Sequence, residues 1–213
     1  MRSRNICETD QWYRFDILNY LIKKYNYQSY LEIGVNTGVN ISRINLDYKI
    51  SVDPGIENKN LYKDISYKLT SDEFFKINTE TFDLIFIDGL HESSQVIKDI
   101  DNSLKILNSR GTIMMHDCFP NSEAAQIPHR VCAQWNGDVW KAFAYYRKRS
   151  DLTMITCITD EGLGIIKKGN QEPYELPSNL NWKYFCKNAK KLMNMQSVPK
   201  TLELIDSLYE NGL

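Results

Sequence analysis

The chain has 213 residues, and its 26 basic and 27 acidic side chains almost cancel, so no strong overall charge attracts nucleic acid or an anionic membrane. This length suits a single α/β domain over residues 1–213. Five widely spaced cysteines without a Cys-x-x-Cys motif argue against a disulfide framework or a structural zinc site, and they favour reduced thiols in a cytoplasmic protein. We find no export signal or transmembrane segment in the sequence.

The first expected element is an amphipathic helix at about residues 10–26. Apolar side chains repeat there at helical spacing, at Trp12, Phe15, Leu18, Leu21, Ile22 and Tyr25. Seven short runs rich in β-branched and aromatic residues predict strands at residues 30–35, 49–53, 65–69, 82–88, 112–116, 152–158 and 164–168. Helical patterns between these runs are typical of βαβ units and a mostly parallel sheet.

Two further helices, a hairpin and a helical tail complete the expected fold. One is a crossover helix around Val96 to Leu107 that Gly111 ends, and the other begins at Val139 with Asp138 as its N-cap. Only residues 159–163 separate the last two strands, too few for a crossover, so we expect an antiparallel hairpin at the sheet edge. A helical tail at about residues 180–213 follows, with a helix at 201–209. The expected fold is a Rossmann-like α/β fold with a seven-stranded, mostly parallel sheet and helices on both faces.

A glycine loop follows the first predicted strand. Gly34 and Gly38 allow a tight turn or a close approach to a ligand, at the strand ends where α/β folds bind ligands. Asp53 ends the second strand at the spacing of an acid that binds ribose hydroxyls. The loop lacks the second glycine of a pyrophosphate motif, and the Glu32 carboxylate suits a ligand ammonium, which favours S-adenosylmethionine (SAM) over a dinucleotide. The alternative is an ordinary strand-to-helix turn.

Five segments in a fixed order carry a family resemblance: YLEIGVNTG, SVDPG, TSDEFF, FDLIFIDGLH and IMMHDCFP. From Leu31 to about Lys168 the chain resembles class I SAM-dependent methyltransferases, and among them macrocin-type sugar O-methyltransferases and cephalosporin hydroxylase-like methyltransferases. The resemblance implies a SAM site in which Asp53 binds the ribose and Ser71 and Asp72 meet the adenine. The methionine part would be held by Glu32, Gly34, Asn36, Thr37 and Gly38. Asp88 would lie beside the cofactor. Ser71 and Asp72 can instead be the N-cap of a helix containing Phe74 and Phe75.

All three histidines lie between residues 91 and 129, beyond the fourth and fifth predicted strands. A hydroxyl is a poor nucleophile, so methyl transfer to it needs an aligned approach and either a base or a metal ion. Asp88, His116 and Asp117 are candidate ligands for a divalent ion, and the resemblance implies magnesium. Relatives often have an oxygen ligand where this chain has His116, so a softer ion, no ion, or a His116 bonded only to backbone stays open.

His91 is the candidate general base, with Asp88 and His116 as the other candidate catalytic residues. An imidazole accepts a proton near neutral pH, and catechol-type relatives place a basic residue three positions after the acid, where this chain has His91. The alternative is an exposed histidine at the start of a helix.

The long segment 118–138 is expected to cover the substrate. Its candidate acceptor contacts, together with the helix that follows, are His129, Arg130, Trp135 and Lys141, and the two cations suit a nucleotide-sugar phosphate. WNGDVWK resembles the corresponding stretch of relatives encoded with polysaccharide genes. Trp135 and Trp140 can instead belong to the core, with Lys141 a solvated charge.

The favoured function is transfer of a methyl group from SAM to a hydroxyl of a sugar or nucleotide sugar in polysaccharide or glycan biosynthesis. The alternatives are O- or N-methylation of another small metabolite and a catalytically silent SAM-binding domain. The expected partner is a small-molecule acceptor, without nucleic acid or membrane, and a homo-oligomer is left open.

Overall fold

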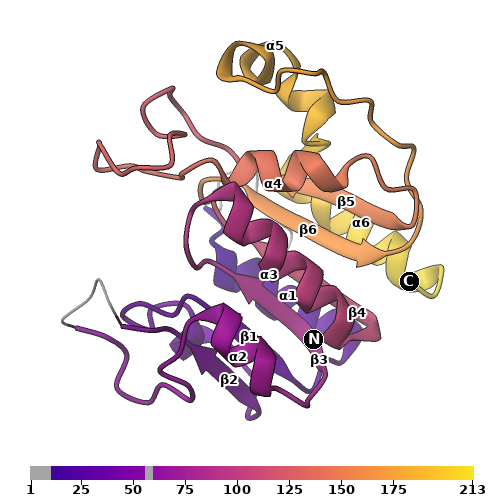
Figure 1. Ribbon diagram of the computed structural model, residues 1–213. Coiled ribbons are helices and arrows are strands. Elements are labelled where there is room, and N and C mark those ends of the chain that lie inside the picture. Colours follow the sequence, from indigo (N-terminus) through magenta and orange to yellow (C-terminus); the bar gives the residue numbers. More distant parts are fainter. Residues whose placement is uncertain (1–10, 56–59) are drawn as a thin grey trace.

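The structure, a computed structural model, describes residues 11–55 and 60–213. These residues form a seven-stranded sheet in the order β2-β1-β3-β4-β6-β5-β7 (Figure 1). The strands are β1 (Tyr30–Ile33), β2 (Lys49–Val52), β3 (Phe82–Ile87), β4 (Leu107–Met115), β5 (Leu152–Cys157), β6 (Leu163–Lys168) and β7 (Met195–Gln196). Strands β1 to β4 pair in parallel with one another, whereas β6 is antiparallel to both β4 and β5.

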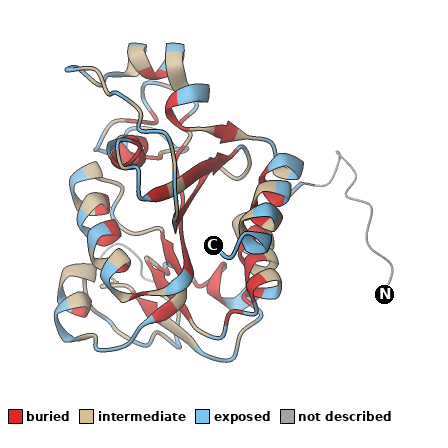
Figure 2. Cartoon of the chain, turned by 90° about the vertical axis from the view of Figure 1, so that its right-hand side faces the viewer, coloured by how far each residue is buried: buried red, intermediate tan, exposed pale blue. Residues whose placement is uncertain are grey.

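Helices cover both faces of the sheet. They are α1 (Arg14–Tyr25), α2 (Ser71–Ile77), α3 (Ser93–Ile106), α4 (Val139–Tyr146), α5 (Trp182–Leu192) and α6 (Val198–Glu210), with a short 3₁₀ helix, η1, at Ile41–Arg43. Figure 2 shows buried residues concentrated along the strands and the inner faces of the helices.

Alternating strand side chains build two separate apolar layers. In β3, Ile85 and Ile87 pack in the layer beneath α2, α3, α4 and α5, while Leu84 and Phe86 pack in the layer beneath α1 and α6. Side chains two residues apart face the same side of a sheet, so near-continuous apolar strands are what a sheet covered on both faces requires. The predicted α/β class with a mostly parallel sheet and an antiparallel hairpin is therefore confirmed.

Residues 65–69 do not form the predicted strand, because their backbone pairs with β2 only through an isolated bridge between Tyr67 and Val52. Near this bridge, serine hydroxyls take the place of the backbone partners that a strand would have. The Ser51 amide donates to the Ser66 Oγ at 3.1 Å, and the Ser66 amide donates to the Ser51 Oγ at 2.7 Å. Local side-chain bonds of this kind compete with sheet pairing.

The hairpin of β5 and β6 forms as predicted, but it does not end the sheet. The short strand β7 pairs in parallel with β5 through Met195 and Gln196, so it makes the edge. Gly111 does not mark the end of the crossover helix either, because α3 ends at Ile106 and β4 begins at Leu107. A side chain at Gly111 would lie 2.9 Å from the Asp83 carbonyl, beside a register shift in β3, so the glycine serves strand packing.

Asp138 is the N-cap residue of α4, as predicted, but its side chain makes no capping hydrogen bond to that helix. Its carboxylate accepts instead from the amide and hydroxyl of Ser93, at 2.6 and 3.0 Å, and so caps α3. Among the described residues, no helix is long and apolar enough to cross a membrane. The described cysteines, Cys118, Cys132, Cys157 and Cys186, are free, and Cys7 lies outside the described residues.

Candidate active site

A cavity of about 1240 Å³ opens at the carboxyl ends of β1 to β4. Pockets for one small ligand usually span about 300–1,000 Å³, so this cavity has room for a cofactor and an acceptor together. The predicted site residues that line it are Glu32, Gly34, Asn36, Thr37, Asp53, Ser71, Asp72, Asp88, His91, His116, Asp117, Arg130 and Trp135. Gly38, His129 and Lys141 are not among the lining residues.

The glycine loop needs its glycines for its own backbone path. Gly34 and Gly38 have φ values of 85° and 80°, in the left-handed region. A side chain at Gly34 would lie 2.0 Å from the Asp88 carbonyl, and one at Gly38 would lie 2.2 Å from the Tyr62 ring. The two glycines therefore let the loop pack tightly against the ends of neighbouring segments.

Asp53 holds the glycine loop in place. Its carboxylate accepts hydrogen bonds from the amides of Val35 and Asn36, at 3.0 and 2.9 Å, and from the Gly55 amide at 2.7 Å. Residues that shape a loop around a ligand also fix where the ligand lies. Asp53 thus reaches the cavity from the predicted position, with a structural task that the sequence did not reveal.

Glu32 is buried beneath the loop, with its side chain bonded at one oxygen. The Tyr30 hydroxyl donates to its Oε2 at 2.5 Å, and the Asn40 amide donates at 2.8 Å. Burial raises the pKa of Glu32 to about 8, although both hydrogen bonds oppose that shift. A cation placed beside this carboxyl would favour its ionised form.

Ser71 and Asp72 line the cavity from the first turn of α2. The Gln95 side-chain amide, from α3, lies 3.2 Å from the Ser71 Oγ and 3.0 Å from the Asp72 Oδ1. The side-chain N-cap of α2 is Thr70, which forms a capping box with Glu73, so neither Ser71 nor Asp72 is the cap that the alternative interpretation required.

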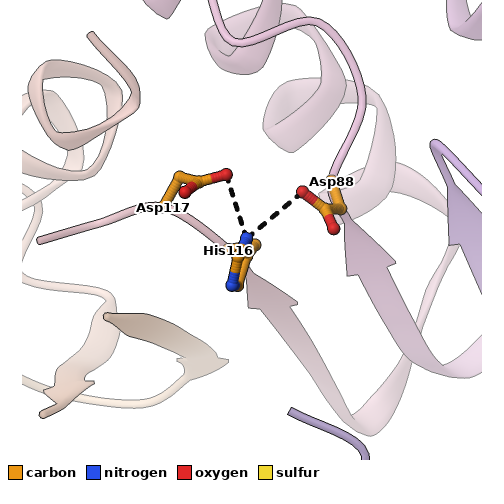
Figure 3. A group of neighbouring side chains, drawn as sticks. All are labelled: Asp88, His116 and Asp117. Atoms are coloured by element: carbon orange, nitrogen blue, oxygen red, sulfur yellow. Dashed lines mark hydrogen bonds and ion pairs between the residues drawn. The ribbon is translucent and has the colours of Figure 1, made fainter. Parts of the chain in front are cut away.

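Two histidines and three carboxylates meet beyond β3 and β4; we call Asp88, His91, His116, Asp117 and Asp160 the polar cluster. Figure 3 shows the His116 ring between Asp88 and Asp117, with its Nδ1 3.4 Å from the Asp88 Oδ1 and 2.9 Å from the Asp117 Oδ2. The Nε2 of His91 lies 3.4 Å from the Asp88 Oδ1 and 3.3 Å from the Asp117 Oδ2. The two rings therefore share the same pair of carboxylates.

The polar cluster stabilises charge on its histidines. Burial opposes a charged His116, but the charge of Asp88 and the hydrogen bond to Asp117 raise its pKa well above the usual value. The pKa of His91 is raised too, since hydrogen bonding to Asp88 and the charge of Asp117 outweigh burial. Burial alone would raise the pKa of Asp88. The charge of His116 and the hydrogen bonds from His116 and His91 instead hold this pKa below its ordinary range.

Arg14 and Asp160 join this cluster although sequence analysis missed both. Arg14 opens α1 and lies 2.7 Å from the Asp88 Oδ2 through its Nη1 and 2.9 Å from the Asp160 Oδ2 through its Nε. Asp160 sits in the β5–β6 turn, where it, Glu161 and Gly162 all have positive φ values. The acidic pair in that turn was the available signal; nothing around Arg14 in the sequence pointed to the site.

The segment before α4 is anchored to the polar cluster at its carboxyl end. The Asn136 side-chain amide lies 2.6 Å from the Asp117 Oδ1 and 2.7 Å from the Glu161 Oε2. A side chain at Gly137, which has a φ of 60°, would lie 1.9 Å from the His91 carbonyl. The Trp135 ring stacks on His91 with 4.9 Å between centroids.

The other candidate acceptor contacts are spread out. Arg130 is exposed and bonds the Ala133 carbonyl, and His129 is exposed without lining the cavity. The Lys141 ammonium lies 3.2 Å from the Asp138 carboxylate. Trp140 is fully buried and belongs to the core, as the alternative interpretation had it, whereas Trp135 is half-buried at the cavity.

The candidate metal ligands come together, with one atom from each of Asp88, His116 and Asp117 within 4.8 Å of the others. Their present contacts do not fit a divalent ion. Asp88 is already paired with the permanent charge of Arg14, and the His116 Nδ1 lies between two carboxylates as a hydrogen-bond donor, whereas a metal ligand needs a free lone pair.

A family model described as a methyltransferase domain matches residues 58–118. The solved structures with a similar fold include the SAH-bound methyltransferase PaMTH1 from Podospora anserina, at 15% identity and a TM-score of 0.54, covering 79% of this chain and 83% of that one. An O-methyltransferase from Bacillus cereus in complex with SAH has 13% identity and a TM-score of 0.51, covering 73% and 80% of the two chains. TomG from Streptomyces achromogenes, in complex with SAM, has 14% identity and a TM-score of 0.51, covering 73% and 79%.

No curated protein matches the chain in sequence. The fold is that of class I methyltransferases, and the matched segment runs through β3 and α3 to the end of β4, where the polar cluster lies. The predicted resemblance to class I methyltransferases is therefore confirmed in the fold, and residues 58–118 match a methyltransferase domain.

Proposed function

We propose that this protein transfers the methyl group of SAM to a hydroxyl of a sugar or nucleotide sugar in polysaccharide or glycan biosynthesis. The observation that carries the proposal is the cavity, which is lined both by the glycine loop and by His91 and the polar cluster. A methyltransferase needs its donor and acceptor in one space, because they must react in line.

The cofactor would lie along the ends of β1 and β2. In the proposed pose, the methionine part meets Glu32 and the loop Gly34, Asn36, Thr37 and Gly38, and the ribose meets Asp53. The adenine reaches Ser71 and Asp72, with Asp88 at the methyl end. SAH and SAM in the similar structures from Bacillus cereus and Streptomyces achromogenes support this choice of cofactor.

In the proposed reaction, the acceptor oxygen attacks the methyl carbon as the carbon–sulfur bond breaks, and S-adenosylhomocysteine leaves with the electron pair. The hydroxyl proton passes to His91. The His91 Nε2 faces Asp88 and Asp117, while its Nδ1 is buried without a hydrogen-bond partner among the described residues. Nδ1 is thus the ring nitrogen that can take the proton, once the bound acceptor displaces the atoms that bury it.

A ring-bearing acceptor suits the mouth of the cavity. Tyr13 and Phe15 stack on each other there with 5.5 Å between centroids, and Trp135 offers a third aromatic side chain. Arg130 and Arg43 supply cations for a phosphate. Aromatic faces with adjacent cations favour a nucleotide sugar over a small aliphatic alcohol. His129 and Lys141 remain candidate acceptor contacts. Neither lines the cavity, so each side chain would have to move to reach the acceptor.

Free cysteines support the proposal of a cytoplasmic enzyme with a small-molecule acceptor. The deciding experiment incubates the purified protein with methyl-labelled SAM and a panel of nucleotide sugars, other hydroxyl and amine metabolites, and no acceptor, each with and without EDTA. We expect label in a nucleotide sugar. Label only in an amine or in another metabolite contradicts the acceptor class, and SAM binding without transfer to any acceptor indicates a silent domain.

A further inference from the structure

Arg14 is the residue that the proposed reaction leaves without a task, although it lies inside the cavity. It connects three segments that are far apart in sequence: the start of α1, the end of β3 at Asp88 and the β5–β6 turn at Asp160. Four of its contacts are charge-assisted hydrogen bonds. The Asp160 carboxylate receives the Arg14 backbone amide at 2.8 Å, Nε at 2.9 Å and Nη2 at 3.2 Å, and Asp88 receives Nη1 at 2.7 Å.

These contacts fix a geometry that a flexible surface pair would not. The guanidinium is planar, and its fork engages both Asp160 oxygens while a further nitrogen reaches Asp88. Only 27% of the Arg14 side chain is exposed, against 18% for Asp88 and 11% for Asp160. Poor access to water weakens screening, so the charge acts strongly on both carboxylates.

The charge balance of the site shows what Arg14 supplies. Four acids gather here, Asp88, Asp117, Asp160 and Glu161, and within the described residues the cations facing them are Arg14 and the two histidines. Glu161 and Asp117 also share the neutral amide of Asn136. Without Arg14, the carboxylates of Asp88 and Asp160 would face each other across His116 alone.

We propose that Arg14 is a positioning residue whose guanidinium takes the place of a divalent ion in this site. It holds the Oδ2 of Asp88, so the Oδ1 turns to His91 and His116. An ion bound to Asp88, His116 and Asp117 would lie within a few ångströms of a fixed positive charge, which repels it strongly at low effective dielectric. The chain thus supplies its own cation to the site.

The test measures Mn²⁺ binding by electron paramagnetic resonance, using Arg14→Met, which removes the charge and keeps the side-chain length. We expect wild type to leave Mn²⁺ free and Arg14→Met to bind it at least about tenfold more tightly, since removal of the guanidinium exposes the acids. Lys23→Met is the matched control, because it removes an exposed positive charge from the same helix, away from the cavity lining. It should bind Mn²⁺ as wild type does.

Arg14→Lys separates charge from geometry. It should still exclude Mn²⁺, since it keeps the charge, but should lower kcat because the fork that orients Asp88 is lost. Tight Mn²⁺ binding by the wild-type protein, or equal Mn²⁺ binding by wild type and folded Arg14→Met, would overturn the proposal. If Arg14→Met does not fold, Arg14→Gln replaces it, and the wild-type measurement decides alone if neither folds. The Mn²⁺ measurements need neither SAM nor an acceptor, so their failure is distinct from failure of the proposed methyl transfer; only the kcat comparison rests on that function.

Discussion

At the scale of a single residue, we expect Glu32 to lose a proton when the cofactor binds. Its pKa is raised to about 8 by burial, so most of it is protonated at pH 7 in the free protein. The proposed SAM ammonium would favour the ionised form. We therefore expect binding at pH 7 to release about one proton, and affinity for SAM to increase as the pH rises toward 8, by at most about tenfold per unit.

Calorimetry in two buffers with different ionisation enthalpies measures the released proton. The matched control is Glu32→Gln, which keeps the shape and hydrogen-bonding oxygen without the titration, and it should bind SAM more weakly with no proton release. Binding by wild type without proton release at pH 7 would show that Glu32 does not meet the ammonium.

His91 is the second residue whose chemistry can be measured. His91→Asn should lower kcat by about 100-fold or more and leave SAM affinity almost unchanged, because a general base typically contributes that much to the rate. Its pKa is raised above 6.5 by bonding to Asp88 and by the Asp117 charge, so the base form appears only at higher pH. The rate should accordingly increase with pH through a value above 6.5.

A pH–rate profile of kcat for wild type and His91→Asn checks both statements, with SAM affinity measured in parallel. A near-normal kcat with a much higher KM for the acceptor would make His91 a binding residue instead.

From the sequence alone, a residue could be placed in the site only where it directly follows a predicted strand. Asp88, His116 and Asp117 follow β3 and β4 directly, so the parallel topology predicts that they meet. Arg14 and Asp160 reach the same place through tertiary packing of α1 and of the β5–β6 turn. No local pattern encodes that approach, and so neither residue could be predicted.

At the scale of elements, the segment before α4 lies against His91, the proposed general base. Trp135 stacks on His91, and its indole nitrogen donates to the Ile127 carbonyl at 2.7 Å. Trp135→Ala should raise KM for the acceptor by at least about tenfold, because an aromatic face over the reacting end is lost. Trp135→Phe keeps a ring and should keep most of the affinity.

Steady-state kinetics with varied acceptor, beside SAM calorimetry, tests this expectation. An equal loss of SAM affinity in Trp135→Ala would mean that the ring orders the whole cavity and not the acceptor end.

Periodicity predicted the long elements well because burial on one or both faces dictates it. It failed where hydrogen bonds from polar side chains determine the local structure. The hydroxyls of Ser51 and Ser66 replace sheet pairing at residues 65–69, and the Asp138 carboxylate caps α3, 45 positions back in the chain, and not its own helix. The two-residue β7 was too short to show a pattern.

At the scale of the whole molecule, a buried lysine makes stability depend on pH. Lys167 is 1% exposed and donates to acceptors from β4 and from Tyr27, and its ammonium lies 4.0 Å from the centre of the Tyr25 ring. Burial and the Arg110 charge lower its pKa to about 7. The unfolded chain therefore binds this proton more readily than the folded one between pH 7 and about 10.

Stability should rise with pH across that window, by at most about 1.4 kcal/mol per unit from this group. Urea unfolding at pH 7, 8 and 9 measures it, with Lys167→Met as the variant that removes the titration. The informative quantity is the difference between the two proteins, because His91 and His116 have raised pKa values and lose stabilising charge over part of the same range. Parallel profiles for the two proteins would refute the expectation.

The anchoring of residues 136–138 has a consequence for how such a protein diversifies. Asn136, Gly137 and Asp138 tie one end of the covering segment to Asp117, His91 and Ser93. Residues 127–134, by contrast, are mostly exposed. If the proposed function holds, substitutions at the exposed positions of this stretch would change the surface offered to the acceptor. Residues 136–138 would keep their contacts with Asp117, His91 and Ser93.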